Sequence, residues 1–257
     1  QLRTKGTYFI EIPEVGKVDY FFNGNGGLNK LYLGNAVQLF NSISIGMNLH
    51  YLFGNIFYAK KFGLNSESSG AIPRFENKLI IGDFIYQFGL QFDKTFKEKY
   101  FITLGAVLEN QSDVKSTSHV LSELYFQGSP ALIGDSVFLS TTYSIQNETT
   151  EGVIMYPYNI GIGISFGLLN TLIFSADYYK QNWSNALIMG KNDSLVNSSS
   201  THFGIEYTPS VASVPNYLKR LNYRVGGYLS NSYISIRGEQ IKDYGMTFGL
   251  GLPLRST

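Results

Sequence analysis

Large apolar residues alternate with small ones over much of this chain, and this period of two is the feature that most constrains its fold. In YNIGIGISFGLLNTLIFSADYY, residues 158–179, one parity holds Ile160, Ile162, Ile164, Phe166 and Leu168, and the other holds Gly161, Gly163, Ser165 and Gly167. Successive side chains of a β-strand point to opposite faces, whereas a helix repeats every 3.6 residues. The alternation therefore predicts strands in which one face is nearly bare.

The same alternation recurs from end to end. We expect about twelve strands, with no helix and no domain boundary. Clear examples lie at 26–40, 43–54, 80–93, 100–109, 202–208 and 243–252. Short polar turns are expected at 40–42, 93–99, 169–171 and 230–232, and longer polar insertions at 63–77, 145–152, 190–200 and 208–216.

Composition separates a membrane sheet from a soluble one. A soluble β-sandwich or lipocalin-like barrel also alternates, but its water-facing parity should be rich in charge. Here charged residues make up only 15% of the 257 residues and aromatic residues another 15%, and the polar parity is mostly Gly, Ser, Thr, Asn and Gln. Large side chains on so many strands would overfill one interior, whereas facing lipid they need no partner.

No apolar run approaches the ~18 residues of a spanning helix, which leaves strands as the membrane-crossing element. The sequence thus predicts an all-β fold, a transmembrane antiparallel up-and-down β-barrel in the outer membrane of a Gram-negative bacterium, surrounded by outer-membrane lipid. Aromatic residues near strand ends are expected to form interfacial girdles; these are Tyr51, Phe53, Tyr178, Tyr179, Tyr207, Tyr223 and Tyr228.

Signatures of an enzyme are nearly absent. His50, His119 and His202 are far apart and do not have metal-ligand spacing, and the chain lacks cysteine, a nucleophile elbow and a phosphate loop. A net charge of +1 gives no field to attract nucleic acid. We therefore expect no enzyme, metal, cofactor or nucleic-acid partner. A Ser/His pair formed across strands remains an alternative.

Polar residues on the glycine-bearing parity are the candidates for lining the lumen. They could line a passage or binding cavity, or they could be polar simply because a lumen holds water or a plug. The candidates are Asn48, His50, Asp83, Gln87, Gln91, Glu109, His202, Glu206 and Arg224, with Asp243 as a further member. Asp177 and Lys180 are interpreted as rim charges at a strand end.

Several segments resemble one family of outer-membrane proteins. Residues 26–56, with their YLFG ending, are similar to FadL/TodX-type transport barrels, and residues 177–186, 203–210, 217–231 and 241–255 resemble a Bacteroidota branch of that superfamily. The resemblance implies a barrel of about fourteen strands in the intact chain. It also implies that residues 1–257 form one barrel domain without the family's N-terminal hatch and its last strands.

The resemblance implies passive uptake of small hydrophobic molecules such as fatty acids, with no cofactor. A kink near Pro157 or Pro209 could open a gap in the wall, because proline donates no ladder hydrogen bond. The alternative is a non-transporting barrel subunit with protein partners in a larger outer-membrane secretion or assembly complex. A general diffusion porin is disfavoured, because the polar parity lacks a ladder of charges.

Overall fold

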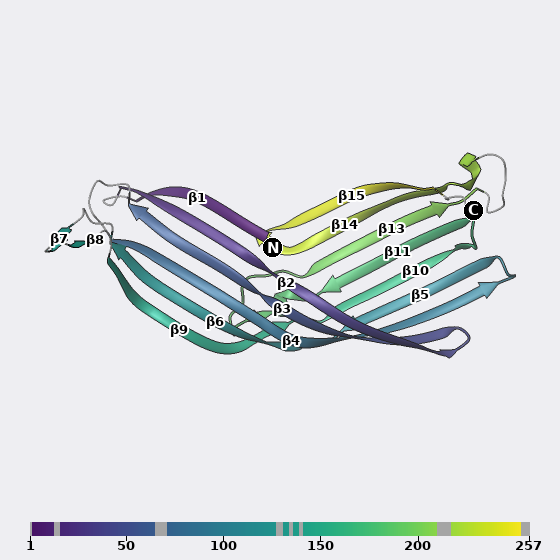
Figure 1. Cartoon of the computed structure of the whole chain (residues 1–257). Helices are drawn as coiled ribbons and strands as arrows, with labels where there is room; N and C mark the ends of the chain where they lie inside the picture. Colours follow the sequence, from purple (N-terminus) through teal and green to yellow (C-terminus); the bar gives the residue numbers. More distant parts are fainter. Residues whose placement is uncertain are drawn as a thin grey trace. The chain divides into compact units, whose positions relative to one another are not determined.

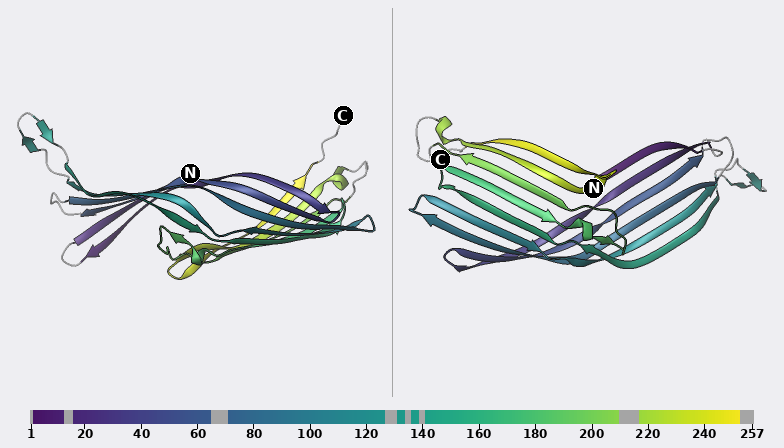
Figure 2. Two further views of the ribbon diagram at one scale, coloured as in Figure 1. Left: turned by 90° about the horizontal axis from the view of Figure 1, so that it is seen from below. Right: turned by 180° about the vertical axis from the view of Figure 1, so that it is seen from behind.

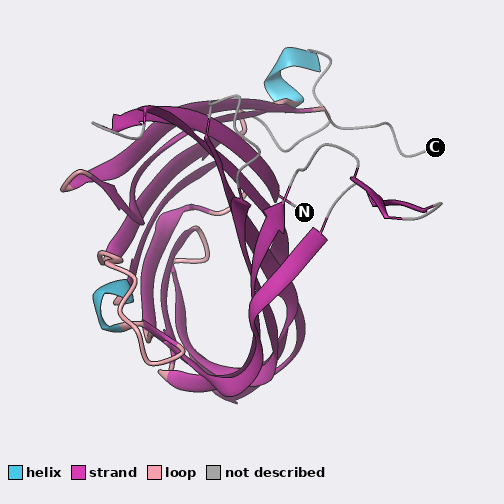
Figure 3. Ribbon diagram, turned by 90° about the vertical axis from the view of Figure 1, so that its left-hand side faces the viewer, coloured by secondary structure: helices cyan, strands magenta, loops and turns pink. Residues whose placement is uncertain are grey.

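The computed structural model describes residues 2–12, 16–64, 71–126, 131–133, 136–138, 141–209 and 217–252. These residues are almost entirely extended, and the only helices among them are the two short 3-10 turns η1 and η2 (Figure 3). No helix among them is long and apolar enough to cross a membrane. The elements are β1 (Leu2–Ile12), β2 (Gly16–Phe40), β3 (Ile43–Leu64), β4 (Ala71–Phe96), β5 (Tyr100–Glu109), β6 (Ser112–Phe126), β7 (Ala131–Ile133), β8 (Ser136–Phe138), β9 (Thr141–Tyr156), β10 (Asn159–Leu168), β11 (Leu172–Gln181), η1 (Trp183–Asn185), β12 (Leu187–Ile188), β13 (Ser198–Tyr207), η2 (Tyr217–Arg220), β14 (Asn222–Ile236) and β15 (Glu239–Gly251).

Thirteen of these strands form one sheet, and β7 and β8 form a separate pair. Every strand pair whose register is given is antiparallel, which confirms the predicted all-β antiparallel class. The chain divides into two compact units. Unit 1 comprises residues 1–31, 51–84 and 114–154, and unit 2 comprises residues 32–50, 85–113 and 155–257.

Unit 2 contains a meander. Its strands follow in chain order as β2, β3, β4, β5, β10, β11, β13, β14 and β15, and β10 to β15 lie side by side in Figures 1 and 2. Backbone hydrogen bonds join the short turns at one end of this meander: Asp93 donates to Ser42, Leu169 to Lys99 and Thr208 to Thr171. The turns predicted near 40–42, 93–99 and 169–171 therefore exist and lie together.

One face of unit 2, the apolar face, carries large side chains that are open to the surroundings. On β10 and β11, Ile162 pairs with Tyr178 and Phe166 with Phe174. Exposed members include Leu104, Leu108, Ile162, Phe166, Phe203, Val225, Phe248 and Leu250. Such a surface is unfavourable in water and is what lipid tails solvate.

The height of this apolar face suits a bilayer. On β11 it runs from Leu172 to Tyr178, and Lys180 follows on the same parity. Leu172 and Lys180 are eight residue steps apart, which at ~3.4 Å per step is about 27 Å along the strand, or about 21 Å after a ~40° tilt. That is close to the ~25 Å apolar band of outer-membrane barrels. In register with Leu172 stand Tyr207 and Tyr223, as expected for an aromatic girdle.

One predicted turn and one predicted insertion are wrong. Residues 230–232 lie inside β14, which turns only at Arg237 and Gly238, and residues 145–152 lie inside β9. The insertion at 190–200 is partly confirmed, because residues 192–197 form a loop, whereas residues 63–64 and 71–77 of the insertion at 63–77 belong to β3 and β4. The rest of 63–77 and most of 208–216 lie outside the described residues. Pro157 interrupts the run between β9 and β10, whereas Pro209 follows β13 rather than kinking a strand.

Two predicted girdle residues are also misplaced. Tyr179 pairs with Gly161 and Tyr228 pairs with His202, so both lie on the face opposite the apolar one. The face on which a residue lies depends on its parity along the strand and not on how near it is to the strand end.

Unit 1 has a small packed interior. Leu52, Leu79, Ile81 and Val114 are buried there, beside the buried hydroxyls of Ser116, Ser118 and Ser122. Aromatic contacts continue across its strands, with Tyr8 stacked on Tyr20 at 4.8 Å between ring centroids. Leu52, which interrupts the polar parity of β3, is thus a core residue.

Candidate functional site

The second face of the unit 2 sheet, here called the polar face, gathers most of the predicted lumen-lining residues. Asn48 on β3 donates from Nδ2 to Oε1 of Gln87 on β4 at 2.8 Å. Gln91 follows Gln87 on the same face of β4 and donates to Asp93 at 2.7 Å. Thr103 donates to the other carboxylate oxygen of Asp93, also at 2.7 Å. The two cross-strand bonds, Asn48 to Gln87 and Thr103 to Asp93, help to fix the register of β3, β4 and β5.

A buried polar cluster lies on this face near the break at Pro157. Glu109 is only 2% exposed and His50 only 7%. Glu109 Oε1 lies 3.8 Å from His50 Nδ1, and Asn159 Nδ2 donates to its Oε2 at 3.4 Å. Burial, and next the nearby Glu109 charge, raise the pKa of Tyr156, which lies beyond the apolar band, to about 12. Tyr156 is therefore a neutral hydrogen-bonding group at physiological pH.

A second polar group lies on β13, β14 and β15. Arg224 Nε donates to Oε2 of Glu206 at 2.7 Å, and Tyr228 donates its hydroxyl to Asp243 at 3.2 Å. The His202 ring stacks against Tyr228 at 6.0 Å. The four side chains predicted here thus fall into two cross-strand sets, Glu206 with Arg224, and His202 and Asp243 with Tyr228.

Asp83 is the one predicted residue that belongs to unit 1. Its carboxylate accepts the backbone N–H groups of Lys115 at 3.0 Å and Phe84 at 2.8 Å. The Lys115 N–H holds the pKa of Asp83 below its ordinary value of 3.8, and the Phe84 N–H and the Lys115 charge act in the same direction, although burial opposes them. The role of Asp83 is thus to tie β4 to β6.

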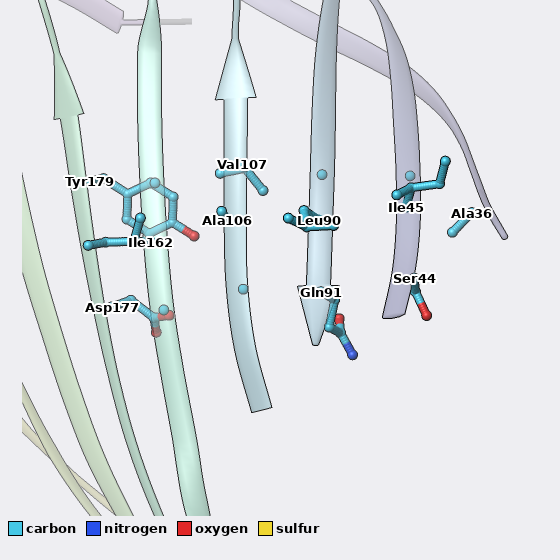
Figure 4. A pocket seen from close by; sticks show the side chains of 15 residues that line it. Ala36, Ser44, Ile45, Leu90, Gln91, Ala106, Val107, Ile162, Asp177 and Tyr179 are labelled. Carbon is cyan, nitrogen blue, oxygen red and sulfur yellow. The ribbon is translucent and has the colours of Figure 1, made fainter. Parts of the chain in front are cut away.

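Between the two polar groups the polar face is hollowed. A hollow of about 240 Å³ spans β2 to β5, β10 and β11 (Figure 4). Its lining includes five glycines, here called the glycine floor: Gly46, Gly89, Gly105, Gly161 and Gly163. Asp177 and Tyr179 enter it from β11, and Gln91 and Ser44 stand on β4 and β3.

The glycines of β10 make room for these β11 side chains. A Cβ on Gly161 would lie 2.5 Å from Tyr179 Cε1, and a Cβ on Gly163 would meet Asp177 Oδ1. A Cβ on Gly105 would meet no heavy atom within 4 Å, so the open part of the hollow lies above Gly105. The space that the glycines leave on the polar face is thus partly filled by side chains of β11.

Asp177 corrects the sequence interpretation, which placed it on a rim. It lies mid-strand, since β11 continues to Gln181, and it shares the polar face with Tyr179. The sequence carried the signal, because Asp177 and Tyr179 have the same parity as Ser175. Lys180 has the opposite parity and ends the apolar band.

A segment between β11 and β13, residues 182–197 and here called the strap, covers one end of the unit 2 strands. Trp183 packs against Tyr156 at 5.6 Å and Tyr233 at 5.1 Å between ring centroids. Asn182 donates to the Tyr158 hydroxyl at 2.6 Å, and Val196 donates its N–H to the Tyr233 carbonyl at 3.0 Å. These contacts join β9 and β14, which no strand ladder brings together.

Among the described residues, no group of three or more His, Cys, Asp or Glu side chains could hold a metal ion. What the polar face offers is a set of hydrogen-bonding groups around a shallow hollow. That arrangement suits binding or lining.

A membrane-height apolar face, an opposite polar face and antiparallel strands throughout define an outer-membrane β-barrel protein. Within that class, the chain belongs to the BamG family, whose sequence model matches residues 9–257. A search of curated protein sequences finds no match. A monoaromatic hydrocarbon channel, CymD, has a similar structure with a TM-score of 0.49 and 9% identity, covering 98% of this chain and 69% of the channel.

Proposed function

We propose that this protein is a non-catalytic barrel subunit of an outer-membrane barrel-assembly complex, in a Gram-negative bacterium of the Bacteroidota. Membership of the BamG family supports this role through the family's name. The polar face would line the lumen, with Asn48, His50, Gln87, Gln91, Glu109, His202, Glu206 and Arg224 among its lining residues.

One structural observation carries the choice against transport of apolar molecules. The side chains that enter the hollow from the polar parity are Ser44, Gln91, Asp177 and Tyr179, with Ala36 and Val107 as the apolar members. A site for a hydrophobic molecule is lined mainly by large apolar and aromatic groups. The large apolar residues that also line the hollow, Ile45, Leu90 and Ile162, contribute to it from positions whose side chains are exposed on the apolar face.

Passive uptake of small hydrophobic molecules, such as fatty acids, is the second candidate. The observation that favours it is the size of the hollow, about 240 Å³, since a cavity of ~150 Å³ accepts benzene. Val107 and the glycine floor give that hollow some apolar surface.

Purification decides between the two. The tagged full-length protein would be extracted from its native outer membrane in mild detergent and examined by native mass spectrometry. An assembly subunit is expected to retain stoichiometric outer-membrane assembly proteins, and a Glu148→Gln variant, altered in unit 1 outside the proposed lumen lining, should retain them equally. A monomer that carries an apolar small molecule and no protein partner contradicts the assembly role and supports uptake.

A further inference from the structure

One carboxylate on the polar face stands apart from the others. Glu206 has the Arg224 guanidinium, Asp243 has the Tyr228 hydroxyl, and Asp93 has Thr103 and Gln91. Among the described residues, Asp177 makes no contact of these kinds with the partners just named, and its side chain lines the hollow. An ionisable side chain at membrane depth is a candidate functional group, and its natural partner is a cation.

The charge of the surrounding wall strengthens this expectation. In the unit 2 ladders the polar parity carries six carboxylates and one guanidinium; these are Asp93, Glu109, Asp177, Glu206, Glu239 and Asp243, with Arg224. The other cationic side chains of these ladders, Lys94, Lys180 and Lys242, have the opposite parity. The wall around the hollow is therefore electronegative although the chain as a whole carries +1.

The register gives the hollow two polar ends. Gln91, Gly105, Gly163 and Asp177 stand opposite one another in a single row across β4, β5, β10 and β11. Three strand spacings separate the outer two Cα atoms by about 14 Å. Because Gln91 uses its amide N–H on Asp93, its carbonyl oxygen remains an acceptor. Between these acceptors stand only two glycines.

An aromatic ring lies beside the carboxylate. Tyr179 follows Asp177 by two residues on the same face of β11, and its ring covers Gly161. A planar cation with several donors satisfies such a site best, because a guanidinium binds a carboxylate through two parallel N–H bonds and stacks on an aromatic face. The volume of about 240 Å³ also leaves room for the methylene stem of such a group.

We propose that the hollow is a binding site for a guanidinium group, held between Asp177 and Gln91 and stacked on Tyr179. The group could belong to a free guanidinium compound or to an arginine side chain of a polypeptide segment inside the lumen. This inference is independent of the assembly role, since it concerns only the chemistry of the hollow.

The test measures binding of N-acetyl-arginine amide to the full-length protein in detergent micelles by saturation-transfer NMR. The matched probe is N-acetyl-citrulline amide, which has nearly the same shape and no charge. We expect the arginine probe to bind at least ten times more tightly than the citrulline probe, and its affinity to fall with added salt. Equal binding of both probes, or no binding of either, overturns the proposal.

Three variants assign the binding to this hollow. Asp177→Asn should weaken the arginine probe at least tenfold. Gly105→Leu should abolish binding by filling the open space, in which an added Cβ meets no heavy atom within 4 Å. Glu148→Gln removes a charge from unit 1 and should leave binding unchanged. Full affinity in both Asp177→Asn and Gly105→Leu refutes the assignment.

A last arm identifies the source of the group. A capped Gly-Thr-Arg-Thr-Gly peptide is compared with the arginine probe on the same protein. Binding of the peptide at least ten times more tightly assigns the site to a polypeptide segment, because backbone contacts to the glycine floor then add to the guanidinium. Equal or weaker binding assigns it to free guanidinium compounds.

Discussion

Replacing Gly167 by alanine should destabilise the protein far more than the same replacement at Gly105. Both glycines lie on the polar parity of neighbouring strands, β10 and β5. At Gly167 an added Cβ would meet the backbone carbonyl oxygen of Leu172, with its carbon at 2.9 Å and the Cα of Ile173 at 3.1 Å, and φ is +159°. These atoms belong to the paired backbone of β11 and cannot move aside as a side-chain tip could.

The magnitude follows from two known effects. Overpacking costs about 1–3 kcal/mol, and a backbone conformation that side chains rarely adopt costs about 1 kcal/mol or more. Gly167→Ala should therefore lower the free energy of unfolding by about 2–4 kcal/mol. Gly105→Ala should raise it by about 0.5–1 kcal/mol, because alanine loses less backbone entropy and the new Cβ meets no atom.

Guanidinium titrations in detergent micelles would measure both variants. The single tryptophan, Trp183, reports loss of tertiary contacts by fluorescence, and the mobility of unheated samples on SDS gels reports the folded sheet. The two midpoints should lie on opposite sides of wild type. If both variants shift equally, or if Gly167→Ala is neutral, close backbone approach is not the reason for the glycine at 167.

Three further outcomes follow from the polar contacts. In a double-mutant cycle with Glu206→Gln and Arg224→Met, the coupling energy should be below about 1 kcal/mol, because this ion pair is partly exposed; a coupling of several kcal/mol would contradict that view. Glu109→Ala should cost about 1–3 kcal/mol in denaturant titrations, since it strands the buried groups around His50, and an unchanged midpoint would refute this. Asp83 has a pKa that is lower in the folded state, so its stabilising effect is complete above about pH 4 and is lost as the pH falls through that lowered pKa. Asp83→Asn should therefore flatten the acid limb of a curve of stability against pH. An unaltered curve would argue against this role of Asp83.

Much of the sheet can be predicted from the sequence, for a physical reason. A lipid-facing side chain needs no complementary partner, so its parity alone determines where it lies. Ile162 and Phe166 were therefore assigned correctly without any knowledge of their neighbours. The insertion and the turn that failed, at 145–152 and 230–232, are polar stretches inside strands. The one at 230–232 coincides with a register shift between Asn231 and Ser235, which polarity alone does not distinguish from a turn.

The candidate site was less predictable, because it depends on pairing between strands. That Glu109 meets both His50 and Asn159 follows from the alignment of β3, β5 and β10, and no local pattern encodes this alignment. The hollow is similar: Gly105 is open and Gly161 is covered, although both are glycines on the same face. The difference is the neighbour, since Gly105 pairs with Gly163 whereas Gly161 pairs with Tyr179.

The sequence predicted only the second part of the strap, as the polar insertion at 190–200, and the strap's integrity should depend on Trp183. Trp183→Ala removes two aromatic pairs, with Tyr156 and Tyr233, each worth about 0.5–1.5 kcal/mol beyond its buried area. We expect amide exchange in residues 182–197 to accelerate at least tenfold, because opening the strap becomes easier by more than about 1.4 kcal/mol. Trp183→Phe keeps a ring in place and should stay closer to wild type. Exchange in β10 and β11, whose ladder hydrogen bonds do not involve the strap, should be unchanged. If exchange across 182–197 in the alanine variant stayed at the wild-type rate, hydrogen bonds would hold the strap without the ring. These bonds run from Asn182 to Tyr158, from Val196 to Tyr233 and from Gln240 to Asn197.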